Sequence, residues 1–101
     1  MNKDELNILR KINKNPDLNQ RKLSDQLGLS LGKINYSIAE LKKRGFIKIK
    51  NFKKSKNKIN YFYILTPKGL LHKTKATLNF MKIKIKEYEE LKQELNEEDK
   101  L

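Results

Sequence analysis

Apolar residues recur at helical spacing in three segments of the first half of the chain, residues 4–14, 20–27 and 31–44. A spacing of three or four residues places the apolar side chains on one face of a helix. The candidate core positions on these faces are Leu6, Ile8, Leu9, Ile12, Leu23, Leu27, Ile34, Ile38 and Leu41. The pattern therefore predicts three short helices that pack around one small core.

Capping residues mark where these helices begin and end. Pro16 ends the first helix because it disfavours the α conformation in the residue before it. Asn19 can cap the second helix, and Gly28 permits the left-handed turn that ends it. Ser30 caps the third helix only two residues later, and Gly45 ends that helix. Two short helices joined by a tight turn containing glycine are typical of a helix-turn-helix.

The next segment has the pattern of a β-hairpin. Residues 46–50 alternate apolar and basic side chains, and residues 61–65 are rich in aromatic and β-branched side chains. Residues 51–60 between them are polar and basic, and we expect them to form a long, charged hairpin tip. Three helices followed by a hairpin predict a winged helix-turn-helix domain over residues 1–66.

A long helix should follow, capped by Thr66 with Pro67 in its first turn. About 30 residues at 1.5 Å each would give a helix roughly 45 Å long, which one small domain cannot cover. The seam has heptad spacing, with Lys92 interrupting it, and a second chain should bury it. We therefore predict a homodimer through residues 67–101 in a mostly α fold with a small β-hairpin (α+β). The interface positions are Leu71, Thr74, Leu78, Met81, Ile85, Tyr88, Leu91 and Leu95.

The charges along the chain indicate an anionic partner and the relative direction of the two long helices in the dimer. The 101 residues carry a net charge of +12, which favours an anionic partner, nucleic acid above a membrane surface. Residues 1–86 hold 22 Lys and Arg against 5 Asp and Glu, whereas residues 87–101 hold 2 against 7. An antiparallel pair of long helices would place the basic half of one beside the acidic half of the other.

The same composition argues against several other classes of protein. The chain has no Cys and a single His, His72, so we expect neither a metal site nor a cofactor. We find no nucleophile–base pair and no Gly-rich phosphate loop, and we expect no enzyme. The scattered acidic residues of the first half, which include Asp4 and Glu5, fit caps and solvated faces. The chain has no membrane-spanning run or apolar leader, which favours a cytoplasmic, nucleoid-associated protein without an evident small-molecule ligand.

DNA is the anionic partner that the helix-turn-helix favours. The face of the third helix opposite its apolar residues carries Gly32, Tyr36, Ala39 and Lys43, and it should enter the major groove. The lysines of the hairpin tip should meet backbone phosphates, as should the start of the second helix. The candidate DNA-binding residues are Gln20, Arg21, Ser30, Leu31, Gly32, Lys33, Asn35, Tyr36, Lys43, Lys53, Lys54, Lys56 and Lys58.

Two longer stretches carry a family resemblance, residues 19–58 and 61–95. "SLGKINY" followed by "NFKKSKNK" resembles the MarR-type winged-helix regulators, above all their short branch associated with exopolysaccharide gene clusters. The resemblance implies a DNA-binding transcriptional regulator, with residues 30–36 leading the recognition helix and residues 53–58 in the wing. It does not extend to the additional helices that form a ligand pocket in larger members, and lysines replace their Asp-x-Arg wing pattern.

Two other functions fit parts of the pattern. A nucleoid-architectural protein would coat DNA with little sequence preference, and its ratio of specific to non-specific affinity would be small. A purely structural coiled-coil adaptor would fail to bind DNA even at low salt. The sequence does not name the operator, the regulated genes or the sign of regulation.

Overall fold

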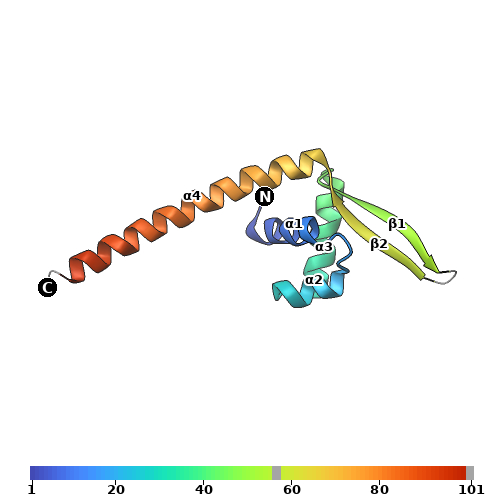
Figure 1. Cartoon of the computed structure of the whole chain (residues 1–101), viewed down its shortest axis with the longest axis horizontal. Coiled ribbons are helices and arrows are strands. Elements are labelled where there is room, and N and C mark those ends of the chain that lie inside the picture. Colours follow the sequence, from blue (N-terminus) through green and yellow to red (C-terminus); the bar gives the residue numbers. More distant parts are fainter. Residues whose placement is uncertain (56–57, 100–101) are drawn as a thin grey trace.

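The chain folds into three short helices, a β-hairpin and one long helix, in the order that the sequence predicts (Figure 1). The computed structural model describes residues 1–55 and 58–99, and the side chains of residues 52–61 lie outside this description. The elements are α1 (Lys3–Lys14), α2 (Gln20–Leu27), α3 (Leu31–Lys43), β1 (Ile47–Ser55), β2 (Lys58–Leu65) and α4 (Pro67–Glu98).

Each helix begins at a polar cap. The side chains of Asn2, Asn19, Ser30 and Thr66 accept hydrogen bonds from the backbone N–H three residues further on. These bonds satisfy backbone donors that have no partner inside the helix. Gly28 ends α2 with a φ of 66°, a conformation that glycine adopts without a steric cost. The predicted caps of α2, α3 and α4 are therefore confirmed.

The core lies where α1, α2, α3 and the base of the hairpin meet. Almost all predicted core positions are buried in it, with Leu27 only half-buried at its edge. Leu18, Phe46, Ile47 and Tyr63 complete the cluster from the loops and the strands. The apolar faces read from the sequence are thus the faces that pack together, as expected when burial drives their association.

The hairpin is longer than predicted. Its antiparallel register pairs Ile47 with Leu65 at the base and continues through Lys53 opposite Ile59, with an irregularity before Ser55. The expectation that residues 51–60 form a long tip beyond the strands was therefore wrong, because strand pairing uses backbone groups and does not need apolar side chains. The backbone N–H of Tyr63 also donates to the carbonyl of Pro16 at 3.1 Å, which ties β2 to the loop between α1 and α2.

Helix α4 leaves the domain on the side away from the hairpin and extends well beyond it (Figure 1). The helix has 32 residues, and the molecule measures 71 × 26 × 20 Å. Gly69 and Ala76 are buried in the first half of α4, whereas every described residue from Met81 to Asp99 is exposed. The long helix and the mostly α fold with a small hairpin are confirmed.

Candidate nucleic-acid interface

The outward face of α3 is free of contacts with the rest of the domain. Ile34, Ile38 and Leu41 bury the opposite face, which aims Tyr36 directly away from the core. Tyr36 is 68% exposed, so its ring is available to a binding partner. Gly32 and Ala39 flank it with little bulk, so the helix can approach a flat or grooved surface closely.

The two flanks of α3 are already engaged by neighbouring helices. Lys33 forms a 2.7 Å ion pair with Asp4 at the start of α1. Asn35, on the other flank, accepts a 3.4 Å hydrogen bond from the side chain of Gln20 in α2. Lys33 and Asn35 therefore lie at the edges of the candidate surface, and Tyr36 lies at its centre.

Gln20 has a second partner in the hairpin. Its side-chain amide also donates to the hydroxyl of Tyr63 at 3.4 Å, and the residue is half-buried. Arg21 and Lys22 follow it in the first turn of α2, and both are exposed. Of the candidates at the start of α2, Arg21 is thus the side chain that the structure leaves at the surface, while Gln20 joins α2, α3 and β2.

One acidic residue that the sequence assigned to a cap or a solvated face is buried. Glu5 is only 7% exposed, and its carboxylate pairs with the guanidinium of Arg44 at 3.3 Å. The prediction was wrong for this side chain because α1 packs across α3, which brings the C-terminal end of α3 over the first turn of α1. Removing one partner of such a pair leaves the other charge poorly solvated. The pair therefore fixes the orientation of the candidate recognition helix.

The remaining candidate DNA-binding residues of α3 differ in whether they are hydrogen-bonded within the helix or simply exposed. Ser30 serves as the N-cap and accepts a 3.1 Å hydrogen bond from the backbone of Lys33. Leu31, Gly32 and Lys43 are exposed. Lys43 lies one turn beyond Ala39 on the outward face, so a positive charge extends the surface around Tyr36 toward the end of α3.

The wing follows directly from the C-terminal end of α3. Lys53 and Lys58 lie on the backbones of β1 and β2 near the end of the hairpin. The side chains of Lys53, Lys54 and Lys58, and the whole of Lys56, lie outside the described residues. Lys48 and Lys50 are exposed nearer the base of the hairpin.

A cluster around Phe46 joins the α3–β1 turn to α4. The Phe46 ring lies 4.4 Å from the imidazole ring of His72 and 5.4 Å from the Nζ of Lys68. Lys68 also donates to the carbonyl of Arg44 at 3.0 Å, and the Thr66 backbone N–H donates to the carbonyl of Phe46 at 3.0 Å. The sequence did not reveal this cluster, since only the tertiary fold brings residues 20 or more positions apart together.

The predicted dimer seam is solvent-exposed in the single chain. Its seven large apolar side chains are between 52% and 62% exposed, from Leu71 to Leu95. Thr74 is exposed as well, and its hydroxyl donates to the carbonyl of Leu70 within α4. Such a long apolar stripe in contact with water is typical of a surface that another chain covers.

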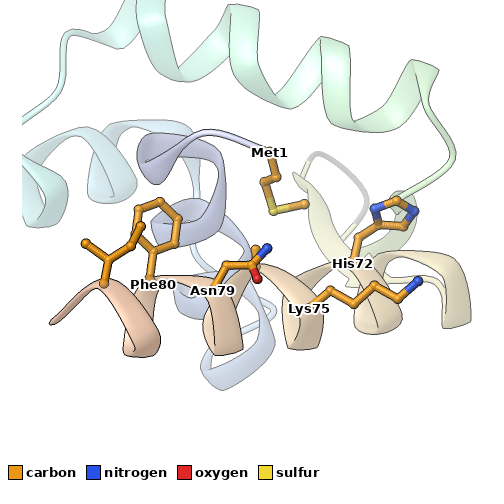
Figure 2. Close-up of a pocket in the computed structure, with 7 residues that line it drawn as sticks. Met1, His72, Lys75, Asn79 and Phe80 are labelled. Atoms are coloured by element: carbon orange, nitrogen blue, oxygen red, sulfur yellow. The ribbon is translucent and has the colours of Figure 1, made fainter. Parts of the chain in front are cut away.

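Hollows open along both sides of the first half of α4. One, of about 250 Å³, lies between Met1 and the α4 residues His72, Lys75, Asn79 and Phe80 (Figure 2). A larger one, of about 390 Å³, lies between α1 and α4. Among the residues that the structure describes, no three potential metal ligands come together. No helix in the described part of the chain is long and apolar enough to cross a membrane.

Comparisons with known proteins agree with this geometry. Residues 1–48 match a family model described as a winged helix-turn-helix DNA-binding domain. The chain is similar to an uncharacterised HTH-type transcriptional regulator of Pyrococcus furiosus, with 30% identity over 91% of this chain and 61% of the relative. A MarR protein from Peptoclostridium difficile is 26% identical, with a TM-score of 0.62 over 82% of this chain and 54% of that protein. These matches show that the chain has a winged helix-turn-helix fold similar to that of MarR proteins.

A third structure, at 23% identity, shares the fold of this chain. It is Streptococcus pneumoniae FabT, in a crystal structure with DNA, with a TM-score of 0.65 over 86% of this chain and 59% of FabT. The chain thus spans between about half and three-fifths of the length of these relatives. The shared part contains α2 and α3, and the family model ends just after β1 begins.

Proposed function

We propose that this chain is a MarR-type, sequence-specific regulator of transcription that binds double-stranded DNA as a homodimer. The observation that carries the proposal is the outward face of α3, the second helix of the helix-turn-helix, where Tyr36 is 68% exposed between two small residues. A helix of this width fits the major groove, where base edges present distinct patterns of donors and acceptors. We therefore assign base reading to the outward face of α3.

Charge supports DNA as the partner. The first 86 residues hold 22 basic and 5 acidic residues, and two of those acids, Asp4 and Glu5, are neutralised by ion pairs with α3 and its C-cap. With these pairs counted, residues 1–86 still carry a large excess of positive charge, which attracts a phosphate backbone. That FabT has been crystallised with DNA supports the same partner for a chain with its fold.

The homodimer is the second part of the proposal. It rests on the exposed apolar seam of α4 and on the anchorage of α4 to the α3–β1 turn. Two chains joined through α4 would present two recognition helices to half-sites about one helical turn apart. Control of exopolysaccharide genes is a finer proposal, which rests only on the resemblance of residues 30–36 and 51–58. Such a regulator would act on chromosomal DNA in the cytoplasm.

Replacing the central aromatic residue of α3 tests base reading. We expect Tyr36→Ala to weaken binding to the preferred site by about 1–3 kcal/mol, because the ring contacts base edges there. Its fold should not change, since Tyr36 lies outside the core and is 68% exposed. The site is first selected from random DNA, and binding is then measured on this site and on a scrambled sequence.

Comparison of the two DNAs decides between a regulator and an architectural protein. The regulator predicts that Tyr36→Ala loses affinity for the selected site and little for the scrambled one. Equal losses on both, or selection that returns no preferred site, would favour the architectural alternative. Tyr36→Phe serves as the matched control, because it keeps the ring and removes only the hydroxyl.

A salt titration tests the wing. If Lys53, Lys54, Lys56 and Lys58 contact phosphates, each lysine changed to Ala should reduce the slope of log affinity against log salt by up to about 0.9. The loss should be the same on selected and scrambled DNA, since phosphates carry no sequence information. Lys73→Ala/Lys86→Ala, two lysines of α4, is the control variant. A quadruple wing variant with an unchanged slope would show that the wing does not contact DNA.

A further inference from the structure

The hollow between α1 and α4 is a groove with an apolar floor. It has a volume of about 390 Å³ and lies between α1 and the first half of α4. Leu6 of α1 and Phe80, Met81 and Ile85 of α4 provide its apolar lining. Its polar lining is mainly basic, from Lys3, Arg10 and Lys84. Such a groove suits an apolar helix face that is bordered by acidic side chains.

The chain itself contains a segment with this chemistry. Residues 87–99 at the far end of α4 are all exposed, and Tyr88, Leu91 and Leu95 among them are about 60% exposed. The same segment is acidic, since residues 87–101 hold 7 acidic and 2 basic residues. It cannot fold back into the groove of its own chain, because α4 runs as one continuous helix.

We propose that the groove between α1 and α4 receives the second half of α4 from another copy of this chain, with the two helices antiparallel. The inference rests on the homodimer proposed above and specifies its geometry. Each chain would then provide one groove and fill one groove, which is the reciprocal contact that a two-fold dimer requires. The winged domains lie at opposite ends of the paired helices in this arrangement.

The heptad pattern of α4 fixes the register. The seam from Leu71 to Leu95 has its midpoint at Ile83, so antiparallel pairing sets Leu71 opposite the partner's Leu95 and Leu78 opposite the partner's Tyr88. Lys92 then faces the partner's Thr74, whereas a parallel pair would place Lys92 against its own copy in the seam. A buried pair of like charges is costly, which favours the antiparallel register.

This register also accounts for Leu91, which lies beside the strict seam. Thr77 and Lys84 line the groove and occupy the same heptad position as Leu91. In an antiparallel coiled coil, residues at this heptad position on one chain lie next to residues at the same heptad position on the partner. The partner's Leu91 would therefore lie near Thr77, over the apolar floor formed by Leu6 and Phe80.

Charges on the other side of the seam are complementary in the same register. Lys75, Lys82 and Glu89 share one heptad position, and all three are exposed in the single chain. Antiparallel pairing brings Glu89 between the partner's Lys75 and Lys82. The acidic segment thus meets basic side chains along both of its borders.

The absence of cysteine from the chain allows a direct test. Two single-cysteine chains, Asn7→Cys in the groove and Leu91→Cys in the acidic segment, are mixed without DNA, allowed to exchange subunits and oxidised. We expect a mixed disulfide between them on a non-reducing gel. Asn7→Cys mixed with Glu90→Cys is the matched control, since Glu90 points away from the partner, and its yield should be several-fold lower.

Each outcome of the cross-linking bears on the proposal. Self-cross-linking of Leu91→Cys would indicate parallel helices and overturn it, as would equal yields with the Glu90→Cys control. The absence of a mixed disulfide, with both variants folded by circular dichroism, would overturn it too. A mixed disulfide in a protein that does not bind DNA would support the groove and refute the proposed function.

Charge reversal provides a second measurement that needs no cysteine. Glu89→Lys should weaken self-association at least several-fold in sedimentation equilibrium, because it faces two lysines of the partner. Adding Lys75→Glu and Lys82→Glu to the same chain should restore association. A triple variant that associates no better than Glu89→Lys would contradict the register.

Discussion

Gly69→Ala is expected to destabilise the protein by roughly 2–4 kcal/mol, a large effect for the addition of one methyl group. A Cβ atom at this position would lie 1.9 Å from the carbonyl oxygen of Phe46, and backbone cannot move aside as a flexible side chain can. Helix α4 would have to shift away from the α3–β1 turn, which would disturb the contacts of Lys68 and His72 with Phe46. Denaturant unfolding at a fixed protein concentration measures the change.

Gly32→Ala is the matched control for this prediction. Gly32 lies within α3, and a Cβ atom added there would have no atom of another element within 4 Å. Alanine favours a helix over glycine by up to about 1 kcal/mol, so this variant should be as stable as the parent or more stable. A Gly69→Ala protein with an unchanged unfolding free energy would show that α4 does not pack closely on Phe46.

Breaking the seam should weaken DNA binding by about 100-fold or more on a site with two half-sites. Leu78→Asp/Ile85→Asp places four charges in the middle of the proposed dimer interface, and the two recognition helices would no longer be joined. Joined modules gain about 10²–10⁴ in affinity over single ones, and this gain would be lost. Sedimentation should show a monomer, and binding to a single half-site should change little.

Asn79→Asp/Gln93→Asp is the control variant, which separates the loss of the dimer from the change in net charge. It adds the same two negative charges to exposed positions of α4 outside the seam. This control should remain a dimer and keep most of its affinity for the double site. A Leu78→Asp/Ile85→Asp protein that still sediments as a dimer would refute dimerisation through the seam.

The anchorage of α4 would let the proposed dimer set the positions of its two recognition helices. Thr66, Lys68 and Gly69 hold the start of α4 on the turn that follows α3, and the Glu5–Arg44 pair holds α3 on α1. These contacts link the candidate recognition helix to the start of the long helix. The geometry of the paired α4 helices would then set the distance between the two outward faces of α3.

The sequence predicted best the features that depend on local patterns, namely the helix caps and the helix faces. Asn19, Ser30 and Thr66 cap helices because a short polar side chain reaches the free N–H groups of its own first turn. The core face of α3 follows from helical periodicity, and its exposed face, with Tyr36, follows from the same rule. These features depend on residues within a few positions of one another, so one chain segment at a time suffices to predict them.

Prediction was weaker where side-chain polarity served as a guide to backbone structure. Residues 51–55 are polar and basic and were expected in a loop, yet they continue β1, because backbone pairing continues from the apolar base of the hairpin. Glu5 was expected in solvent, and its burial depends on Arg44, which lies 39 positions away. No local pattern identifies such a partner.

The sequence by itself thus determined the order of the elements, their caps, the core faces of the helices and the excess of positive charge. Only the tertiary structure decided which polar side chains are engaged, since the pairing of Lys33 with Asp4 and of Gln20 with Tyr63 depends on how helices and strands cross. The tertiary structure also created the groove between α1 and α4, since its two sides lie about 75 positions apart in the chain. The spacing of apolar residues predicts which side chains of one helix or strand face the core. Contacts between distant elements arise only when the core brings those elements together.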